Sequence, residues 1–431
     1  MLRDLLGRSS KNSTISETIL KNMRWFLYDG LFAASSLAII NTFYTLYLEA
    51  LGATSAQIGL LSSLTNTIML LVMLPGAWVS ERIGSRKNAV LFTMSGLSRF
   101  FILVSAFVPF WFTGQAAVMP VIAVKLLIDN TNIIGTPAWT SLSADIVPIH
   151  YRGRYFAVRG LVMNISTMVT TLAIGRLITG IGKPEGFQVA MGIAFVIGMI
   201  STVLFAQIKE PPKRTAARPS YSPRSLIATL RDDCNLRNFS IYVFMWNASI
   251  ALAGPFFSIY IVRELHASTA TVGTLSVLAT LSGLPSTYFF GKLVDKHGGH
   301  RILTIAGFLV PFLPWLWMLA RAPWGALPAY LYDGFVWAGY SLASFSFILS
   351  LTKPSRLALY NSIIQVVVSL GAIVGASLGG VLIGELGFRT VFFLSGAGRM
   401  LSMFFFWRMV KKADESACVE DEPEVEPQPA S

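Results

Sequence analysis

Residues 291–301 read GKLVDKHGGHR, and residues 77–87 read AWVSERIGSRK. Both stretches follow one pattern: a small residue, three variable residues, an acid, a base, a variable residue, a glycine, two variable residues and a base. The two acids, Glu81 and Asp295, are 214 residues apart in a chain of 431 residues. A motif that recurs at about half the chain length predicts two related halves.

The composition indicates that lipid rather than water covers much of this chain. Apolar residues make up 54% of it and charged residues only 13%, whereas a soluble domain carries about 25% charged residues. Too few polar residues are present to cover a core of this size. The net charge of +12 does not indicate a nucleic-acid partner, because the basic residues fall between apolar segments.

Apolar segments of about 20 residues, the length that crosses the hydrocarbon of a bilayer, recur twelve times. The first six are expected at 25–48, 57–79, 89–112, 116–139, 155–181 and 187–208, and the second six at 239–262, 271–294, 302–320, 324–350, 357–384 and 388–409. The chain therefore divides into an N-terminal segment 1–24, a first half 25–208, a linker 209–238, a second half 239–410 and an acidic tail 411–431.

The lysines and arginines predict how these spans are oriented. Of the 34, 26 fall in the termini and in the loops on the same side as the termini, Arg159 among them; four fall on the other side and four within spans. Cytoplasmic loops of membrane proteins carry an excess of basic residues. We therefore expect a multi-pass protein of the cell membrane with both termini in the cytoplasm.

Together with the twelve spans and the long middle linker, the repeated motif resembles the signature of the major facilitator superfamily. In that family the motif follows the second helix and again the eighth. The second copy fits in full, while the first has Ala77 for the leading glycine and Glu81 for the aspartate. The resemblance covers residues of about 20 to 410. It implies an all-α membrane fold of twelve helices in two pseudo-symmetric six-helix halves, and secondary transport by alternating access.

The resemblance also implies a gate at the motif, formed by a contact of its acid that closes the cytoplasmic face when the transporter opens outward. The glycines suit a tight turn at the lipid boundary, because they supply backbone freedom. The alternative is that the stretches are two ordinary basic turns. The residues expected to form the gate are Glu81, Arg82, Gly84, Arg86, Gly291, Asp295, Lys296, Gly298 and Arg301.

Ionisable residues within lipid are costly, so each is a candidate for function. Lys125 and Asp129 are four residues apart in the fourth span, which places them on one face of a helix. The resemblance implies that spans one, four, seven and ten line the central cavity. The two residues either bind substrate or protons, or form a permanent ion pair.

Candidates in the second half combine one acid with aromatic and amide side chains. Asp333 and Trp337 lie in the tenth span, and Trp246 and Asn247 lie in the seventh. Aromatic residues at helical spacing usually pack in a core, so substrate contact competes with packing here.

Three carboxylates are candidates for carrying a proton across the membrane. Asp29 lies in the inner quarter of the first span, where it either binds a proton or pairs with a base such as Arg24. The four histidines fall outside the expected spans, which leaves Asp29, Asp129 and Asp333 as carriers.

Arg99 and Arg399 lie in spans three and twelve, which the resemblance makes peripheral, so we expect them to pair with buried groups and not with substrate.

Absent patterns narrow the function further. The sequence has no Walker phosphate loop, no Cys/His metal pattern and no nucleophile–base set, so we expect neither an ATP-driven pump nor an enzyme, and no cofactor or metal. The expected partners are a small organic solute of amphipathic or zwitterionic character, protons and membrane lipids. The alternatives are a non-transporting receptor or scaffold, or a lipid flippase, on the same fold; drug export is neither indicated nor excluded.

Overall fold

The computed structural model describes residues 17–82, 85–148, 151–210, 229–351 and 357–411, and these ranges contain helices and no strands. The helices of the first half are α2 (Glu17–Ala50), α3 (Ser55–Arg82), α4 (Arg86–Val90), η1 (Leu91–Leu97), α5 (Ser98–Trp111), η2 (Gly114–Ala117), α6 (Val118–Ile146), α7 (Arg152–Ile181) and α8 (Glu185–Ala206). Those of the second half are α10 (Cys234–Ala253), η4 (Gly254–Phe256), α11 (Phe257–Arg263), α12 (Thr269–His297), α13 (Gly299–Leu309), α14 (Phe312–Leu319), η5 (Pro323–Ala326), α15 (Leu327–Ser350) and α16 (Leu357–Met409).

The expected spans coincide with these helices. In the described part of the chain, nine helical stretches are long and apolar enough to cross a membrane. One of them, 359–409, holds two expected spans, because α16 is broken at Gly387, where the backbone has φ 79° and ψ 167°. Helices α12 and α15 are not among the nine, although each coincides with an expected span. Boundaries differ by several residues: α10 already begins at Cys234, within the stretch expected as linker.

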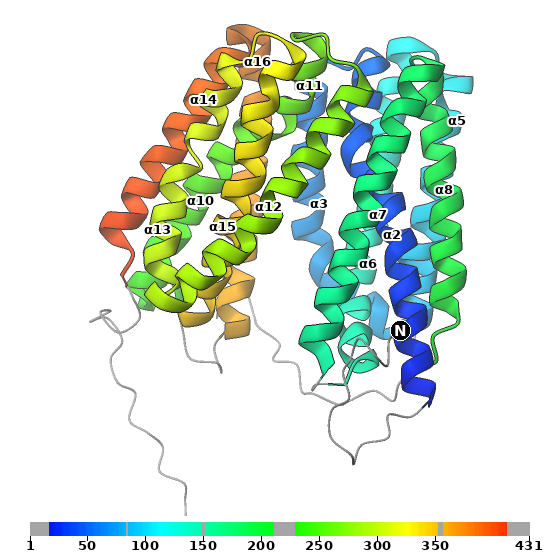
Figure 1. The fold of residues 1–431 in the computed structure, drawn as a ribbon, viewed down its shortest axis with the longest axis horizontal. Helices are drawn as coiled ribbons and strands as arrows, with labels where there is room; N and C mark the ends of the chain where they lie inside the picture. Colours follow the sequence, from blue (N-terminus) through cyan, green and yellow to red (C-terminus); the bar gives the residue numbers. More distant parts are fainter. Residues whose placement is uncertain (1–16, 83–84, 149–150, 211–228, 352–356, 412–431) are drawn as a thin grey trace, which may run out of the picture.

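The helices form two bundles that lie side by side. In Figure 1 the blue to green bundle contains α2 to α8, and the green to red bundle contains α10 to α16. Helix α2 packs against α7 and α8, and α10 packs against α16, so each bundle has its own internal contacts. Helices α3 and α16 form the most extensive contact between the bundles, followed by α7 and α12; α11 also contacts α2.

Successive membrane-spanning segments alternate in direction, so each segment begins and ends at one of two faces. We call the face at which α2 begins the N-terminal face, and the opposite one the far face. In Figure 1 the two bundles meet at the far face, near the top of the view, and their helices diverge toward the N-terminal face.

Close approach of backbones explains where helices pack most tightly. A Cβ on Gly375 would lie 2.1 Å from the carbonyl oxygen of Ala248, and one on Gly379 would lie 2.2 Å from that of Leu252. Small residues spaced four apart on α16 therefore let α10 lie directly against it. Large apolar side chains on other faces stay exposed, Phe110 and Leu319 among them, as expected for helices that contact lipid.

Candidate functional site

Lys125 and Asp129 form an ion pair one helical turn apart on α6. The Lys125 Nζ lies 2.5 and 2.6 Å from the two carboxylate oxygens of Asp129. From α3, the Thr65 hydroxyl donates a hydrogen bond of 3.3 Å to the same carboxylate. The side chains of Lys125 and Asp129 are 15% and 22% exposed. Mutual neutralisation lowers the cost of holding both charges within a membrane-spanning helix.

This pair lines a cavity of about 220 Å³ between α2, α3 and α6 of the first half and η4 of the second. The ring of Tyr44 forms one wall: its centroid is 5.6 Å from the Lys125 Nζ, and its hydroxyl donates to the Val121 carbonyl at 3.0 Å. The remaining lining residues are Ile40, Asn41, Thr45, Ile58, Leu61, Ser62, Thr65, Asn66 and Pro255. The cavity therefore offers one anion, one cation, an aromatic face and several neutral hydrogen-bonding groups.

Asp29 lies in the core of the first half and does not line this cavity. It is 5% exposed, accepts a 2.6 Å hydrogen bond from Ser201 of α8, and has the Arg159 Nη2 of α7 at 3.8 Å. Of the two expected roles, the structure shows pairing, but Arg159 is the partner and not Arg24.

Arg159 lies in a helix, as the expected span 155–181 predicted, and not in the loop to which the charge count assigned it. This side chain is 6% exposed and lies within α7. Its guanidinium carbon is 4.1 Å from the ring centroid of Phe26, and its Nε donates to the Phe26 carbonyl at 3.2 Å. The charge count grouped it with Arg152 and Arg154, which in the structure also belong to α7.

The aromatic candidates of the second half pack against one another. Trp246 is 2% exposed and stacks on Tyr340 with ring centroids 4.8 Å apart. The Tyr340 hydroxyl lies 2.8 Å from that of Tyr242, and Trp337 meets the Tyr340 ring edge-on at 5.4 Å. Asn247 donates to the Val243 carbonyl of its own helix at 2.8 Å. Packing thus accounts for Trp246, the alternative that competed with substrate contact.

Asp333 and Arg399 are the charged groups inside the second half. Arg399 is 1% exposed, and its Nε and Nη1 have no hydrogen-bond partner among the described residues. Asp333 on α15 lies close enough to influence it electrostatically, yet the two form no ion pair within 4.0 Å in the described part of the chain. In the first half, Arg99 is likewise buried, and donates to the Ser36 hydroxyl at 3.1 Å.

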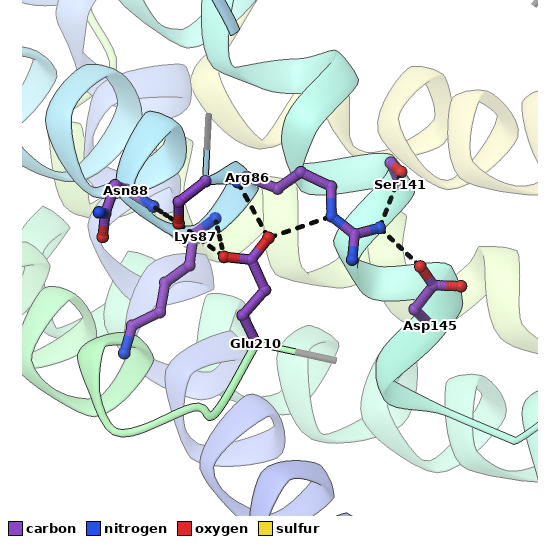
Figure 2. A network of polar contacts seen from close by, with 7 residues as sticks. Arg86, Lys87, Asn88, Ser141, Asp145 and Glu210 are labelled. Carbon is purple, nitrogen blue, oxygen red and sulfur yellow. Dashed lines mark hydrogen bonds and ion pairs between the residues drawn. The ribbon is translucent and has the colours of Figure 1, made fainter. Parts of the chain in front are cut away.

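The first motif copy takes part in a charge network on the N-terminal face (Figure 2). Arg86 at the start of α4 has its Nη1 2.6 Å from Asp145, near the end of α6, and 3.1 Å from the Ser141 hydroxyl. Its Nε lies 3.2 Å from Glu210, which follows α8. Placement of Gly84 and of the Glu81 and Arg82 side chains lies outside the described part of the chain.

Glu210 also caps the start of α4. Its carboxylate accepts hydrogen bonds from the backbone N–H of Arg86 at 3.0 Å and from the Ser85 hydroxyl at 2.6 Å. Burial alone would raise the pKa of Glu210, but these hydrogen bonds outweigh it and lower the pKa below its ordinary value of 4.5. The sequence analysis assigned no role to Glu210 or Asp145. Asp145 lies near the end of α6 and Glu210 follows α8, both on the same face as the basic motif. Acids at these helix ends could have been identified as partners of the basic motif.

The second motif copy is arranged differently. Gly298 joins α12 to α13 with φ 81°, a conformation that favours glycine, while Gly291 lies within α12. The side chains of Asp295, Lys296 and Arg301 are exposed, and no ion pair holds any of them among the described residues. The two copies therefore share a sequence pattern but not a set of contacts.

Polar contacts between the halves lie toward the far face. The Ser63 hydroxyl is 2.7 Å from that of Ser377, and the Thr179 hydroxyl is 2.8 Å from that of Thr269. Arg263, at the end of α11, donates to the Ala53 carbonyl at 3.1 Å. Glycines permit this closeness: a Cβ on Gly59 would lie 2.6 Å from the Ala376 carbonyl oxygen and 2.9 Å from the Cα of Gly380.

Comparison with known proteins finds relatives that align with most of this chain. The chain is 24% identical over 404 residues to the multi-drug resistance efflux pump PmrA of Streptococcus pneumoniae serotype 4, covering 89% of this chain and 94% of that protein. It is 21% identical over 392 residues to the multidrug resistance protein MdtG of Salmonella schwarzengrund, covering 88% and 92%.

Solved structures share the fold at low sequence identity. A D-xylose-proton symporter superposes with a TM-score of 0.68 at 13% identity, covering 92% of this chain and 99% of that one. The nucleoside transporter NupG superposes with a TM-score of 0.67 at 13% identity, covering 92% and 100%. The family model of the Major Facilitator Superfamily matches residues 30–248 and 239–429. This multi-pass membrane protein therefore belongs to the Major Facilitator Superfamily of transporters.

Proposed function

We propose that the protein is a secondary transporter that moves a small organic solute by alternating access. The observation that carries this proposal is the Lys125–Asp129 pair, which lines a cavity from within a membrane-spanning helix. A charged pair in such a position is costly to keep unless it binds or moves something. Alternating access would expose the cavity to each side of the membrane in turn.

The N-terminal face is proposed to be cytoplasmic, with both chain termini on that side of the cell membrane. The excess of basic residues at this face supports the orientation. The described hydrogen bonds between the halves involve Ser63, Thr179 and Arg263, which lie toward the far face. This arrangement supports a state that is closed to the outside and open toward the cytoplasm. The exposed Asp295 agrees with it, because the gate implied by the motif would then be released.

Protons are proposed as the coupling ion and Asp129 as their first carrier. Of the three intramembrane carboxylates, Asp129 is the one that lines the cavity. Asp29 is enclosed by Arg159 and Ser201, and Asp333 lies beside the buried Arg399. The contact of Asp129 with Lys125, one helical turn away, could be made and broken as the helices move during the transport cycle.

The substrate is proposed to be an amphipathic or zwitterionic organic molecule. The protein is proposed to export it from the cell. The anion, cation and Tyr44 ring of the cavity suit such a solute. Two relatives that align over most of the chain are named as multidrug efflux or resistance proteins, which supports export.

Transport in proteoliposomes tests this function. Purified protein is reconstituted, and a chemically diverse set of amphipathic cations, zwitterions and neutral solutes is followed with and without an imposed pH gradient. We expect at least one solute to accumulate against its gradient on the side more acidic than the other, because an exchanged proton moves down its own gradient. Solute fluxes equal to those of protein-free liposomes across the whole set would reject transport. A solute flux that is the same with and without the pH gradient would reject proton coupling but not transport.

A further inference from the structure

A side-chain amide closes the first half on its N-terminal face. Asn22, near the start of α2, is 5% exposed. Its Nδ2 donates to the Lys209 carbonyl at 2.8 Å, and the Lys209 N–H donates to its Oδ1 at 2.9 Å. Lys209 follows the end of α8, 187 residues along the chain. One side chain therefore satisfies both backbone groups of a residue that no longer belongs to a helix, as a neighbouring strand would.

The second half contains the same contact. Asn235, near the start of α10, is 8% exposed; its Nδ2 donates to the Lys411 carbonyl at 3.1 Å, and the Lys411 N–H donates to its Oδ1 at 3.0 Å. Lys411 follows the end of α16. The repeat thus extends to a clasp between the first helix of each half and the residue after its last helix. An amide suits this task, because it offers a donor and an acceptor side by side.

What lies next to each clasp differs between the halves. Lys209 is followed by Glu210, whose carboxylate binds Arg86 and caps α4. Arg86 stands two residues after Gly84, and the residue two after Gly298 is His300. The His300 Nε2 lies 3.0 Å from the Val410 carbonyl oxygen, and Lys411 is followed in the sequence by a lysine. The residue that follows Lys209 is thus an acid, whereas the one that follows Lys411 is a lysine. The ionic network that Glu210 completes therefore belongs to the first half.

We propose that Asn22 is a positioning residue that delivers Glu210 to Arg86. Beyond the end of α8, the backbone of Lys209 has no helical hydrogen bonds to hold it. Without the clasp, Glu210 would have to lose the conformational freedom of its backbone each time it met Arg86. With both groups of Lys209 bound, the next residue is already directed toward the start of α4. The N-terminal segment of α2 thus controls a contact between the linker and the first motif copy.

Two amides report this contact without any transport assay. The N–H groups of Arg86 and Lys87 are in the first turn of α4, where no helical acceptor exists, and both donate to Glu210, at 3.0 and 3.4 Å. Their hydrogen exchange therefore measures how well Glu210 is placed. Because this measurement does not depend on the role of the network in gating, its failure and a failure of the proposed transport are distinguishable.

The experiment compares hydrogen exchange in the full-length protein with that of Asn22→Ala, Asn235→Ala and Glu210→Ala. Asn22→Ala should speed exchange at 86 and 87 by roughly tenfold, the factor that one net hydrogen bond corresponds to, and so approach Glu210→Ala. Asn235→Ala is the matched control: it removes the same two bonds and should speed exchange at Lys411 while leaving 86 and 87 unchanged.

The double variant Asn22→Ala, Glu210→Ala should exchange at 86 and 87 no faster than Glu210→Ala alone, since both changes remove one contact. Additive effects would overturn the positioning role, and so would wild-type exchange at 86 and 87 in Asn22→Ala. If Asn22→Ala does not fold, Asn22→Asp replaces it. Aspartate still accepts from the Lys209 N–H but no longer donates, so exchange at 86 and 87 should lie between wild type and Glu210→Ala; wild-type exchange there would again reject the proposal.

Discussion

The Ser63 hydroxyl of α3 lies 2.7 Å from the Ser377 hydroxyl of α16, so the two halves touch side chain to side chain at this point. Helix α3 belongs to the first half and α16 to the second, and the contact is toward the far face. In alternating access, such a contact must break whenever the cavity opens to that side.

Cysteines at these two positions should therefore lock the halves together. We expect Ser63→Cys with Ser377→Cys to form a disulfide on oxidation, since the hydroxyl oxygens are already nearly in contact. After cleavage at a protease site inserted in the linker, the two fragments should stay joined until a reductant is added. In all of these variants, native Cys234 and Cys418 are changed to serine. The two fragments of each single variant should separate without a reductant. Separation of the oxidised double variant would contradict the contact.

Loss of the Asp129 carboxylate should uncouple transport from the pH gradient. Asp129→Asn keeps the side-chain size but cannot release a proton, so accumulation driven by the gradient should be abolished while solute exchange is partly retained. The measurement is uptake and exchange in proteoliposomes of a solute that the wild-type protein accumulates in the screen proposed above. If the variant still concentrates that solute in response to the gradient, Asp129 is not the carrier, and Asp333→Asn should be tested next.

The Asp29–Arg159 pair should matter for stability. Breaking a buried ion pair by removing one partner costs about 3 to 5 kcal/mol, because the other charge stays buried without compensation. Asp29→Asn should accordingly lower the melting temperature of the purified protein. Adding Arg159→Met should recover much of the loss, since the uncompensated charge is gone. A double variant as unstable as the sum of the two single variants would indicate that the residues act independently.

Labelling with a membrane-impermeant maleimide tests the orientation. Gln115 and Ala322 are exposed residues of the far face, so Gln115→Cys and Ala322→Cys should react in intact cells. Position 115 is chosen over Gly114 because the φ of Gly114 is 55°, where a cysteine would be strained. Native Cys234, at the start of α10, should react only after the cells are permeabilised. Reaction of Cys234 from outside would reverse the proposed topology.

The Glu210 network should respond to acid pH. Because the pKa of Glu210 is lowered in the folded protein, its carboxylate contributes stability above its ordinary value of 4.5, and this contribution is lost as the pH falls through the folded pKa. The difference in melting temperature between wild type and Glu210→Gln should therefore be constant above pH 4.5 and shrink below it. A difference that is the same at every pH would show that the charge of Glu210 contributes nothing.

Hydropathy predicted the helices well, because crossing a bilayer imposes length and composition on a sequence directly. The break between the last two spans fell between 384 and 388, and the structure places it at Gly387. Helices extend further than expected at the N-terminal face, where α2 begins at Glu17 and α12 ends at His297. Those extra turns are polar, so hydropathy does not detect them.

Within the candidate site, the pair that the sequence predicted was the one held on a single helix. The spacing of Lys125 and Asp129 fixes their shared face whatever the tertiary packing. Partners on different helices were missed, because they depend on how each helix is rotated about its axis. Arg159 for Asp29 and Glu210 for Arg86 are of this kind. The role of Arg86 in the gate and that of Asp29 in proton transfer remain predictions.

The burial of Arg399 has a consequence for how the protein is made. A central arginine costs about 2.5 to 3.5 kcal/mol when its helix enters the bilayer. Among the described residues, Asp333 on α15 acts electrostatically on Arg399, and α15 is synthesised before the part of α16 that carries Arg399. We therefore expect Arg399 to enter the bilayer more readily when α15 is already in place, and the order of synthesis provides that order of assembly.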